Sequence, residues 1–159
     1  MKTNAARALD TLGIAYRLLS YAVDPDDLAA ESAAAKVGLP PEQVFKTLVI
    51  RGDRSGVCLA VIPGNSQLDL KAFAKRSGNR KAEPVALKDV QPLTGYIRGG
   101  VTALACKRAY PVYVDETITR FDQVAVSAGM RGLMIQLAPD DYLRAIKGTL
   151  GDIAQAKSL

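Results

Sequence analysis

The sequence predicts an α+β fold, with one domain spanning residues 1–159 and helices surrounding a curved mixed or antiparallel sheet. Apolar, strand-like runs are interspersed with helical segments, but without the strict βαβ alternation of a parallel sheet. Two pairs of these runs are joined by short glycine-containing turns of the kind that close β-hairpins. A length of 159 residues suits a single domain with a substantial core.

The N-terminal part of the chain predicts a helix, a strand and a second helix. Apolar residues recur at helical spacing up to Gly13, and an alanine-rich run ends at Gly38; glycine at such positions is a typical helix stop. Asp26 or Asp27, in an Asp-Pro-Asp-Asp turn, can cap the second helix. The expected elements are a helix over residues 4–12, a strand over 15–21, a helix over 28–37 and a short helical turn over 40–43.

The middle of the chain predicts a β-hairpin followed by a helix. Two β-rich runs flank the turn Gly-Asp-Arg-Ser-Gly, a strong hairpin signal. Asp69 is placed to cap the next helix, which Gly78 ends, and a later short helix ends at Gly95. The expected elements are strands over 44–51 and 57–63, a helix over 70–77, a short strand within 82–87 and a short helix over 87–94.

The C-terminal part predicts three strands and a final helix. The paired glycines Gly99 and Gly100 interrupt regular structure before the first of these strands. Pro139 suits the first turn of the last helix, where a missing N–H is tolerated. The expected elements are strands over 110–116, 123–129 and 132–138 and a helix over 139–148.

The composition excludes several classes of active site. The chain has no histidine and two cysteines, Cys58 and Cys106. This excludes Ser–His–Asp and Cys–His hydrolases and leaves no ligand set for zinc, so we expect neither a metal nor a cofactor. No apolar run approaches the ~20 residues of a membrane helix, and the N-terminus lacks the apolar core of a secretory signal. We therefore expect a cytoplasmic protein with no membrane partner.

Positive charge is concentrated in one segment. The formal net charge is +5. A basic face of this kind suits a polyanion such as RNA, and a solvated helix face accounts for it equally well. The residues concerned are Lys71, Lys75, Arg76, Arg80 and Lys81, with Lys107 and Arg108 further along the chain.

Lys46 stands out within the strand Val-Phe-Lys-Thr-Leu-Val-Ile. The period of two places Lys46 on the same face as Val44, Leu48 and Ile50, an otherwise apolar face. Its ammonium can extend to water from the strand, or it can lie at the floor of a cleft and stabilise an oxyanion or a phosphate. The strand pattern alone leaves both interpretations open.

Two glycine-containing stretches also suggest a site. They are Thr-Gly-Tyr-Ile-Arg-Gly-Gly over residues 94–100 and Val-Ser-Ala-Gly-Met-Arg-Gly over residues 126–132. Glycine allows positive φ and close approach of a ligand to the backbone. Taken singly, each stretch is explained as well by an ordinary turn or hairpin loop.

Together, these three stretches resemble the YbaK/EbsC family, free-standing trans-editing proteins related to the inserted editing domain of bacterial prolyl-tRNA synthetases. The resemblance covers essentially the whole chain and rests on Phe-Lys-Thr, Thr-Gly-Tyr-x-x-Gly-Gly and Ser-x-Gly-x-Arg-Gly-Leu in this order. It implies an enzyme that hydrolyses mischarged aminoacyl-tRNA, chiefly Cys-tRNA(Pro), with the acceptor end of tRNA as partner and prolyl-tRNA synthetase as a possible transient partner. It also implies the family's editing-domain fold.

The resemblance assigns roles to individual residues. It implies that the substrate's own thiol attacks the ester and releases a cyclic thiolactone, so that the protein supplies orientation and oxyanion donors. Lys46 and the backbone of Gly99 and Gly100 would act in catalysis. The substrate-binding residues implied are Tyr21, Thr47, Ser127, Gly129 and Arg131.

The sequence departs from the family pattern at several positions in or near these motifs: Ala103, Cys106, Ala128, Met130 and Met134. The aminoacyl group therefore stays open between cysteine and alanine or another small residue. A non-catalytic module that binds tRNA or a synthetase is an alternative from a different class, and retention of Lys46 and both glycine motifs speaks against it. A nucleophilic Cys106 is disfavoured because no histidine is available as its base.

Overall fold

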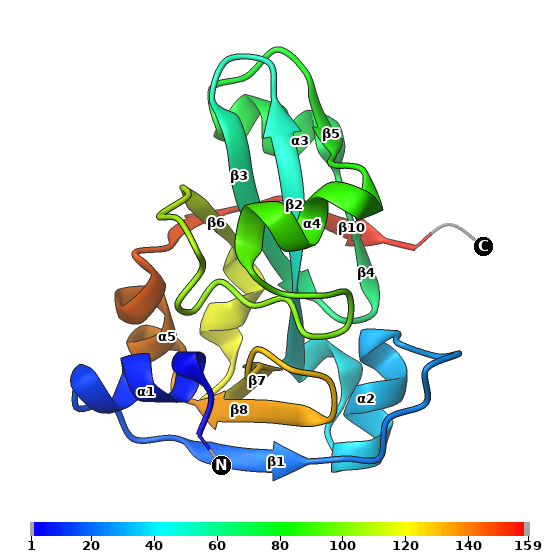
Figure 1. Cartoon of the computed structure of the whole chain (residues 1–159). Coiled ribbons are helices and arrows are strands. Elements are labelled where there is room, and N and C mark those ends of the chain that lie inside the picture. Colours follow the sequence, from blue (N-terminus) through cyan, green and yellow to red (C-terminus); the bar gives the residue numbers. More distant parts are fainter. Residues whose placement is uncertain (1, 158–159) are drawn as a thin grey trace.

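A mixed sheet with helices around it forms the centre of the molecule (Figure 1). The computed structural model describes residues 2–157 and confirms the predicted α+β fold. The strand order is β1-β8-β7-β2-β3-β6-β9, and β5 pairs with β2 beside this path. The sheet consists of β1 (Arg17–Ser20), β2 (Val44–Gly52), β3 (Gly56–Pro63), β5 (Ala82–Pro84), β6 (Val112–Asp115), β7 (Val124–Ser127), β8 (Leu133–Leu137) and β9 (Thr149–Gly151).

Five helices and a two-stranded ladder complete the described part of the chain. The ladder pairs β4 (Ser66–Leu68) with β10 (Ala154–Ala156) in antiparallel fashion. Single 3₁₀ turns, η1 and η2, precede β2 and follow β6. The bounds are α1 (Asn4–Thr11), α2 (Ala30–Val37), α3 (Leu70–Arg76), α4 (Leu87–Thr94), α5 (Pro139–Ile146), η1 (Pro41–Gln43) and η2 (Glu116–Arg120).

Strand β2 changes partner along one of its edges. On one edge it pairs with β3 over residues 45–52. On the other edge, residues 44–45 pair with β7 in parallel and residues 50–52 pair with β5. The Val49 carbonyl also accepts a hydrogen bond from the Val85 N–H at 3.0 Å. Within the described strands this leaves a gap beside residues 46–48, where the edge of the sheet is open.

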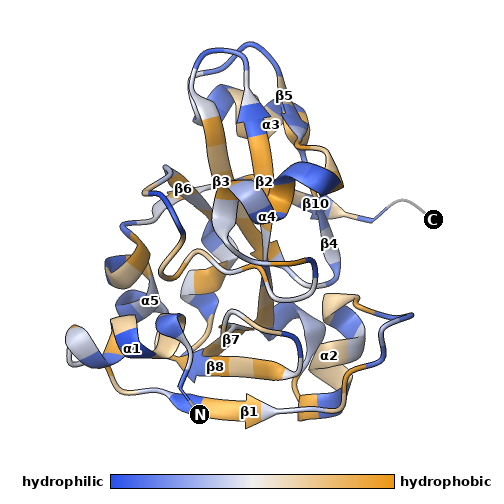
Figure 2. Ribbon diagram, in the orientation of Figure 1, coloured by the Kyte–Doolittle hydropathy of each residue, from blue (hydrophilic) through white to orange (hydrophobic). Residues whose placement is uncertain are grey.

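Hydrophobic colours cover much of β2 and β3 (Figure 2), and the apolar residues on the two faces of β2 belong to different core clusters. Phe45 and Val49 face the largest cluster, which includes residues of α1 and α5. On the opposite face, Val44 packs with Ala33 and Ala34 of α2, whereas Ile50 packs with Phe73 of α3 and its neighbours. The alternation expected from the sequence is thus confirmed, and Lys46 lies on the second face between two separate apolar clusters.

The local signals located most elements correctly. Gly13, Gly38 and Gly95 follow helices with φ of 69°, 75° and 84°, and the Asp69 carboxylate accepts a hydrogen bond from the Ala72 N–H at 3.0 Å at the start of α3. The predicted cap of α2 was wrong. Ala29 is the residue before that helix and no side chain caps it. Strands β4, β9 and β10, each of three residues, were not predicted, because segments so short show no clear period.

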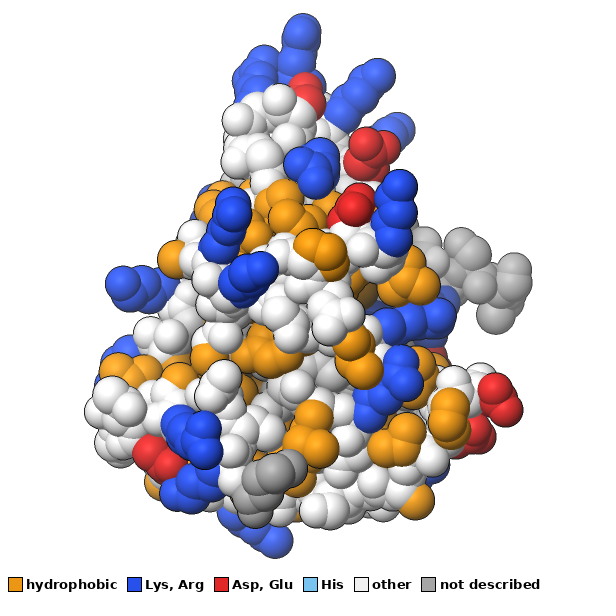
Figure 3. Space-filling model, in the orientation of Figure 1, with side chains coloured by type: hydrophobic (Ala, Val, Ile, Leu, Met, Phe, Trp, Pro, Cys, Tyr) orange, Lys and Arg blue, Asp and Glu red, His pale blue; other side chains and the backbone are white. Residues whose placement is uncertain are grey.

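Basic side chains gather at the end of the molecule formed by the β2–β3 turn, α3 and β5 (Figure 3). Arg51, Lys71, Arg80 and Lys81 line a shallow depression there, together with two acidic residues. Arg76 is directed elsewhere, since its Nε donates to the Leu150 carbonyl at 2.9 Å. None of the helices in the described residues has the length and apolar character that a membrane crossing requires.

Candidate active site

A pocket of about 320 Å³ opens at the gap in the edge of β2. Its walls come from α2 and the residues before it, β2, the Gly64 turn, α4 and the loop that follows it, the ends of β1, β7 and β8, and Lys157. The size is at the lower end of the range for small-molecule sites. We call this cavity the Lys46 pocket.

Lys46 is half-buried in this pocket. Its Nζ donates one hydrogen bond, to the Gly64 carbonyl oxygen at 3.2 Å. An ammonium group has three N–H donors, so two remain available to a ligand. The position between two apolar clusters explains how a lysine is accommodated on this face of β2. The aliphatic stem of Lys46 lies along the strand, and its ammonium group reaches the pocket.

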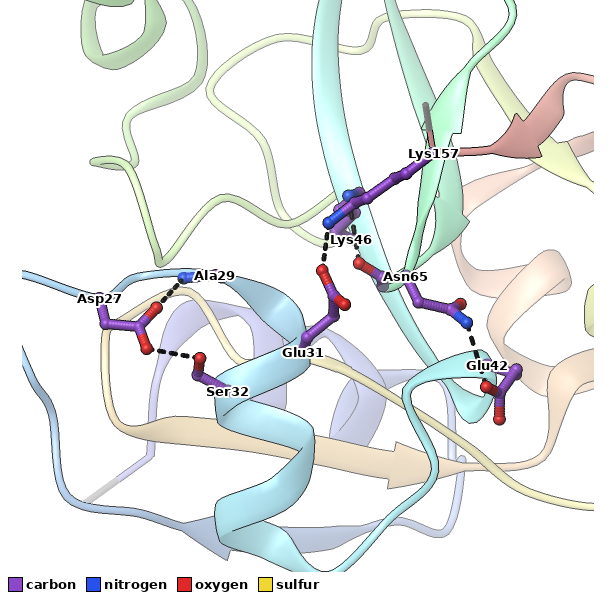
Figure 4. Close-up of polar contacts among 9 residues, drawn as sticks. Asp27, Ala29, Glu31, Ser32, Glu42, Lys46, Asn65 and Lys157 are labelled. Atoms are coloured by element: carbon purple, nitrogen blue, oxygen red, sulfur yellow. Dashed lines mark hydrogen bonds and ion pairs between the residues drawn. The ribbon is translucent and has the colours of Figure 1, made fainter. Parts of the chain in front are cut away.

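The charges around Lys46 come from two other segments (Figure 4). Burial lowers the pKa of the Lys46 ammonium below its ordinary value of 10.5, and the nearby Lys157 ammonium lowers that pKa further. Glu31 acts in the opposite direction. Glu31, on α2, forms an ion pair with Lys157, the residue after β10. Lys46 and Lys157 are thus two cations at one site, and Glu31 forms an ion pair with Lys157.

The carbonyl oxygen of Gly64 accepts the hydrogen bond from Lys46. The Gly64 N–H lies 3.1 Å from the Pro41 carbonyl oxygen and 2.6 Å from that of Val44. A Cβ at this position would lie 3.0 Å from the Val44 carbonyl oxygen and 3.2 Å from the Ala30 Cβ. Only glycine fits there without displacement of its neighbours. The same turn is joined to η1 by a hydrogen bond of 3.0 Å from the Asn65 amide to the Glu42 carboxylate (Figure 4).

The alanine-rich wall of the pocket is fixed by Asp27. Its carboxylate accepts hydrogen bonds from the Ala29 N–H at 3.3 Å and from the Ser32 hydroxyl at 2.6 Å (Figure 4). The aspartate expected to cap α2 therefore fastens the approach to the helix instead. Ala29, Ala30 and Ala33 line the pocket, so this contact positions its small-residue side.

Thr47 lines the pocket next to Lys46, but its side chain lies on the other face of β2, beside the buried Tyr142 hydroxyl. Its backbone is the part directed at the gap. Strand hydrogen-bonding groups alternate between the two edges, and Val49, two residues on, uses the open edge for its bond to Val85. The Thr47 N–H and C=O therefore face the space between β7 and β5.

Gly99 and Gly100 lie in a tight turn after α4. The Gly100 N–H donates to the Ile97 carbonyl at 2.9 Å, and Gly99 has a φ of 89°, which together define a type II turn. The Gly100 amide is therefore engaged, contrary to the expectation that both amides face the ligand. Gly99 lines the pocket, and its N–H has no hydrogen-bond acceptor among residues 2–157.

The two glycine stretches pack against each other. A Cβ on Gly100 would lie 3.0 Å from the Met130 Cα, and a Cβ on Gly129 would lie 2.9 Å from the Tyr96 ring. Arg131 donates from Nε to the Arg98 carbonyl at 2.8 Å. Gly100, Gly129 and Arg131 do not line the Lys46 pocket. Their contacts hold together the two loops that border it.

Tyr21 and Ser127 border the pocket on the side of β1 and β7. The Tyr21 N–H donates to the Gly132 carbonyl at 2.9 Å, which joins the end of β1 to the second glycine loop. The Ser127 Oγ accepts a hydrogen bond from the Gly129 N–H at 3.2 Å. The structure thus brings together Lys46, Tyr21, Thr47, Gly99 and Ser127 at one pocket.

Some residues of the site carried no clear signal in the sequence. Gly64 follows a proline at a strand end and had the weak signal of any Pro-Gly turn. Glu31 and Lys157 are 126 positions apart, and nothing local connects them. Met134, noted as a departure from the family pattern, is buried and lines the pocket.

Cys106 lies outside the Lys46 pocket. Burial raises the pKa of its thiol to about 11, so the group is protonated at neutral pH. Its Sγ lies 3.1 Å from the Thr102 carbonyl oxygen. A partly buried, protonated thiol is a poor nucleophile, and the position agrees with the interpretation of Cys106 as a packing residue.

Comparison with known proteins gives the family. Residues 24–145 match the family model of the aminoacyl-tRNA editing domain. The chain is 43% identical over 152 residues to EbsC of Enterococcus faecalis, provisionally named a Cys-tRNA(Pro)/Cys-tRNA(Cys) deacylase, with 96% of this chain and 93% of EbsC covered. It is 28% identical over 137 residues to the multifunctional Ser/Thr-tRNA deacylase ProXp-y of Escherichia coli, with 83% and 80% covered.

A solved structure shows the same fold. A protein provisionally described as a trans-editing enzyme for prolyl-tRNA synthetase superposes with a TM-score of 0.84 over 98% of this chain and 99% of the other, at 24% identity. The resemblance to the YbaK/EbsC family is confirmed by the match to EbsC. The chain belongs to the aminoacyl-tRNA editing domain family.

Proposed function

We propose that this protein is an aminoacyl-tRNA deacylase that edits mischarged tRNA in trans and acts most strongly on Cys-tRNA(Pro). Family membership supports an aminoacyl-tRNA editing hydrolase. The observation that carries the proposal is the Lys46 ammonium, half-buried in a small pocket and bonded to the protein through a single contact, the Gly64 carbonyl. A charged donor so placed can stabilise the oxyanion that forms when an ester is attacked.

The attacking group in this mechanism comes from the substrate. The pocket is lined by hydroxyl groups but by neither histidine nor cysteine, so an imidazole base and a thiol nucleophile are both missing from its lining. The cysteinyl sulfur attacks the ester carbonyl, a C–S bond forms and the bond to the ribose oxygen breaks. The thiol proton ends on the ribose hydroxyl, and a cyclic thiolactone leaves.

The protein then supplies orientation and charge. Lys46 and the unengaged Gly99 N–H are the donors best placed for the oxyanion. Holding the thiol and the carbonyl in reacting geometry contributes several kcal/mol of barrier reduction in comparable intramolecular reactions. Tyr21, Thr47 and Ser127 bind the aminoacyl-adenosine end around them. Gly100, Gly129 and Arg131 act indirectly, by holding the loops in place.

The pocket wall favours a small apolar aminoacyl side chain. Ala33, Val44 and Met134 are buried together and line the pocket. Cysteine behaves as a small hydrophobic group. A serine or threonine hydroxyl buried against such a wall without a partner costs roughly 1–3 kcal/mol. Cysteine and alanine therefore fit, and cysteine alone of the two carries the attacking thiol.

The partner in this proposal is the acceptor end of a tRNA, with prolyl-tRNA synthetase as a transient partner that presents the misacylated product. The basic surface lined by Arg51, Lys71, Arg80 and Lys81 supports contact with the tRNA backbone. From Lys46 to Arg51 the extended strand β2 spans about 17 Å. A tRNA whose ester reaches the pocket can therefore place further phosphates near that surface.

The test is an assay of ester loss with Cys-tRNA(Pro), Ala-tRNA(Pro), Ser-tRNA and Thr-tRNA, against the uncatalysed rate of each. We expect Cys-tRNA(Pro) to be cleaved fastest and a thiolactone to appear before free cysteine. Cleavage of Ala-tRNA(Pro) with Cys-tRNA(Pro) spared would eliminate the thiol-assisted mechanism, because alanine has no thiol. Binding of all four without cleavage would indicate a non-catalytic module.

A further inference from the structure

We propose that Lys157 is a further substrate-positioning residue, whose ammonium binds the phosphate that precedes the terminal ribose of the acceptor end. In the unliganded protein Glu31 forms an ion pair with that ammonium, and the phosphate replaces Glu31 as its partner when the substrate binds. The proposal rests on the proposed function, because it extends the same site by one phosphate.

The fold delivers Lys157 to the Lys46 pocket through strand pairing. In the β4–β10 ladder Ala156 is opposite Ser66, and Lys157 is the next residue. Ser66 follows directly on the turn that contains Gly64, whose carbonyl accepts the hydrogen bond from Lys46. The two lysines therefore reach one site from two strands, and Figure 4 shows their ammonium ends converging above α2.

The charges at this point favour an incoming anion. Two ammonium groups face the site. Glu31 forms an ion pair with one of them, Lys157, and raises the pKa of the other, Lys46. The Lys157 and Glu31 side chains are 44% and 43% exposed. Ion pairs this exposed contribute little to stability, so Glu31 can yield to a phosphate at small cost. A phosphate bound to Lys157 replaces Glu31 as the negative charge beside the two ammonium groups.

Lys157 also stands where the substrate must continue beyond the pocket. It lines both the Lys46 pocket and an adjoining groove of about 530 Å³. The groove wall is aliphatic and includes Leu48, Leu68 and Leu87. A nucleotide with its ester at Lys46 and its base against this wall passes its 5′ phosphate by Lys157. A chain of bases joined by phosphates matches a surface with apolar walls and cations along it.

Binding of small ligands tests the proposal without reference to catalysis. Adenosine 5′-monophosphate and adenosine differ by the phosphate alone, and their dissociation constants are measured by calorimetry for wild type, Lys157→Ala, Lys157→Arg and Glu31→Gln. Lys88, an exposed lysine of α4 outside both cavities, gives the control Lys88→Ala. Circular dichroism and melting temperature verify that each variant is folded.

We expect wild type to bind the phosphorylated ligand about tenfold more tightly than adenosine, as for one charge-assisted hydrogen bond. Lys157→Ala should remove this difference and leave adenosine binding unchanged, Lys157→Arg should retain most of it, and Lys88→Ala should behave as wild type. Glu31→Gln should strengthen binding of the phosphorylated ligand, because the competitor is gone. If the ion pair has only a structural role, Lys157→Ala and Glu31→Gln should weaken the binding of both ligands by the same factor.

A folded Lys157→Ala variant that keeps the phosphate preference, or that loses affinity for both ligands equally, would overturn the proposal. A Glu31→Gln variant with weaker phosphate binding would overturn the exchange between Glu31 and the substrate. With Cys-tRNA(Pro), Lys157→Ala should raise KM and leave kcat unchanged. If wild type shows the phosphate preference but cleaves none of the aminoacyl-tRNAs, the proposed function fails while the phosphate site stands.

Discussion

The Nε of Arg131 donates a hydrogen bond to the carbonyl oxygen of Arg98 at 2.8 Å. This contact joins the loop after β7 to the type II turn that contains Gly99 and Gly100. The same two loops meet where Gly100 lies against the Met130 backbone. Gly100 and Gly129 thus serve loop packing, and this packing determines the shape of the pocket border.

Replacement of Arg131 by alanine should therefore lower deacylation about tenfold, because the turn that presents the Gly99 N–H loses its tether. The melting temperature should change little, since Arg131 is partly exposed and lies outside the buried core. Turnover of Cys-tRNA(Pro) and thermal unfolding measure the two effects. Arg120→Ala, at an exposed arginine of η2, is the control. Wild-type turnover in Arg131→Ala would show that the tether is dispensable.

Lys46→Met should reduce turnover by at least about a hundredfold, the usual loss when an oxyanion donor is removed. Methionine preserves most of the aliphatic stem along β2 and removes a single hydrogen bond, the one to the Gly64 carbonyl, so the fold should persist. Single-turnover kinetics with Cys-tRNA(Pro) measure the effect, with Lys88→Met as control. Full activity in a folded Lys46→Met protein would refute the role assigned to this ammonium.

The alkaline side of the pH–rate profile should report Lys46. Its pKa lies below 10.5 because of burial and of the Lys157 charge, while Glu31 opposes that shift. Activity that needs the charged form is lost as pH rises through the lowered pKa. Glu31→Gln should move this loss to lower pH, and Lys157→Ala should move it to higher pH. Rates are corrected for spontaneous ester cleavage at each pH, and coincident profiles for all three proteins would contradict the assignment.

The same shift has a consequence for stability. Between the lowered folded pKa and 10.5 the unfolded chain binds more protons at this residue than the folded protein does, so the free energy of unfolding attributable to Lys46 rises with pH across that window. Denaturant unfolding of wild type and Lys46→Met at several pH values isolates this contribution. The difference between the two proteins should favour wild type progressively as pH increases.

Cys106→Ala should retain activity within about twofold, because a thiol with a pKa of about 11 is protonated at neutral pH and lies outside the pocket. Initial rates with Cys-tRNA(Pro) measure this. Alkylation by iodoacetamide at neutral pH should also be slow for the native protein. A folded Cys106→Ala variant without activity would reinstate Cys106 as a candidate nucleophile.

The basic surface should affect tRNA binding but not the chemistry at the ester. Lys71→Ala combined with Lys81→Ala should weaken binding of aminoacyl-tRNA and reduce the slope of log affinity against log salt by about one for each phosphate that no longer pairs with a lysine. Hydrolysis of a small cysteinyl ester of adenosine should stay at the wild-type rate. If both the affinity and its salt dependence are unchanged, the segment is a solvated face.

The elements with strong local signals could be predicted from the sequence. The hairpin of β2 and β3, the glycine-terminated helices and the Asp69 cap all depend on residues adjacent in the chain. The cap of α2 was mispredicted because Asp27 has two alternative donors nearby. It accepts hydrogen bonds from the Ala29 N–H and the Ser32 hydroxyl rather than from a backbone N–H of the first turn. The short strands β4, β9 and β10 depend on distant partners, which local patterns do not contain.

By itself, the sequence determined the face on which Lys46 lies, because the period of a strand is a local property, and it determined the absence of histidine chemistry. Only the tertiary structure decided what Lys46 faces. The gap in the edge of β2 exists because β7 and β5 pair with different ends of that strand. The Gly64 acceptor and the Glu31–Lys157 pair reach the same place through pairings between segments far apart in the chain. Such proximity arises from tertiary packing, and no local sequence pattern predicts it.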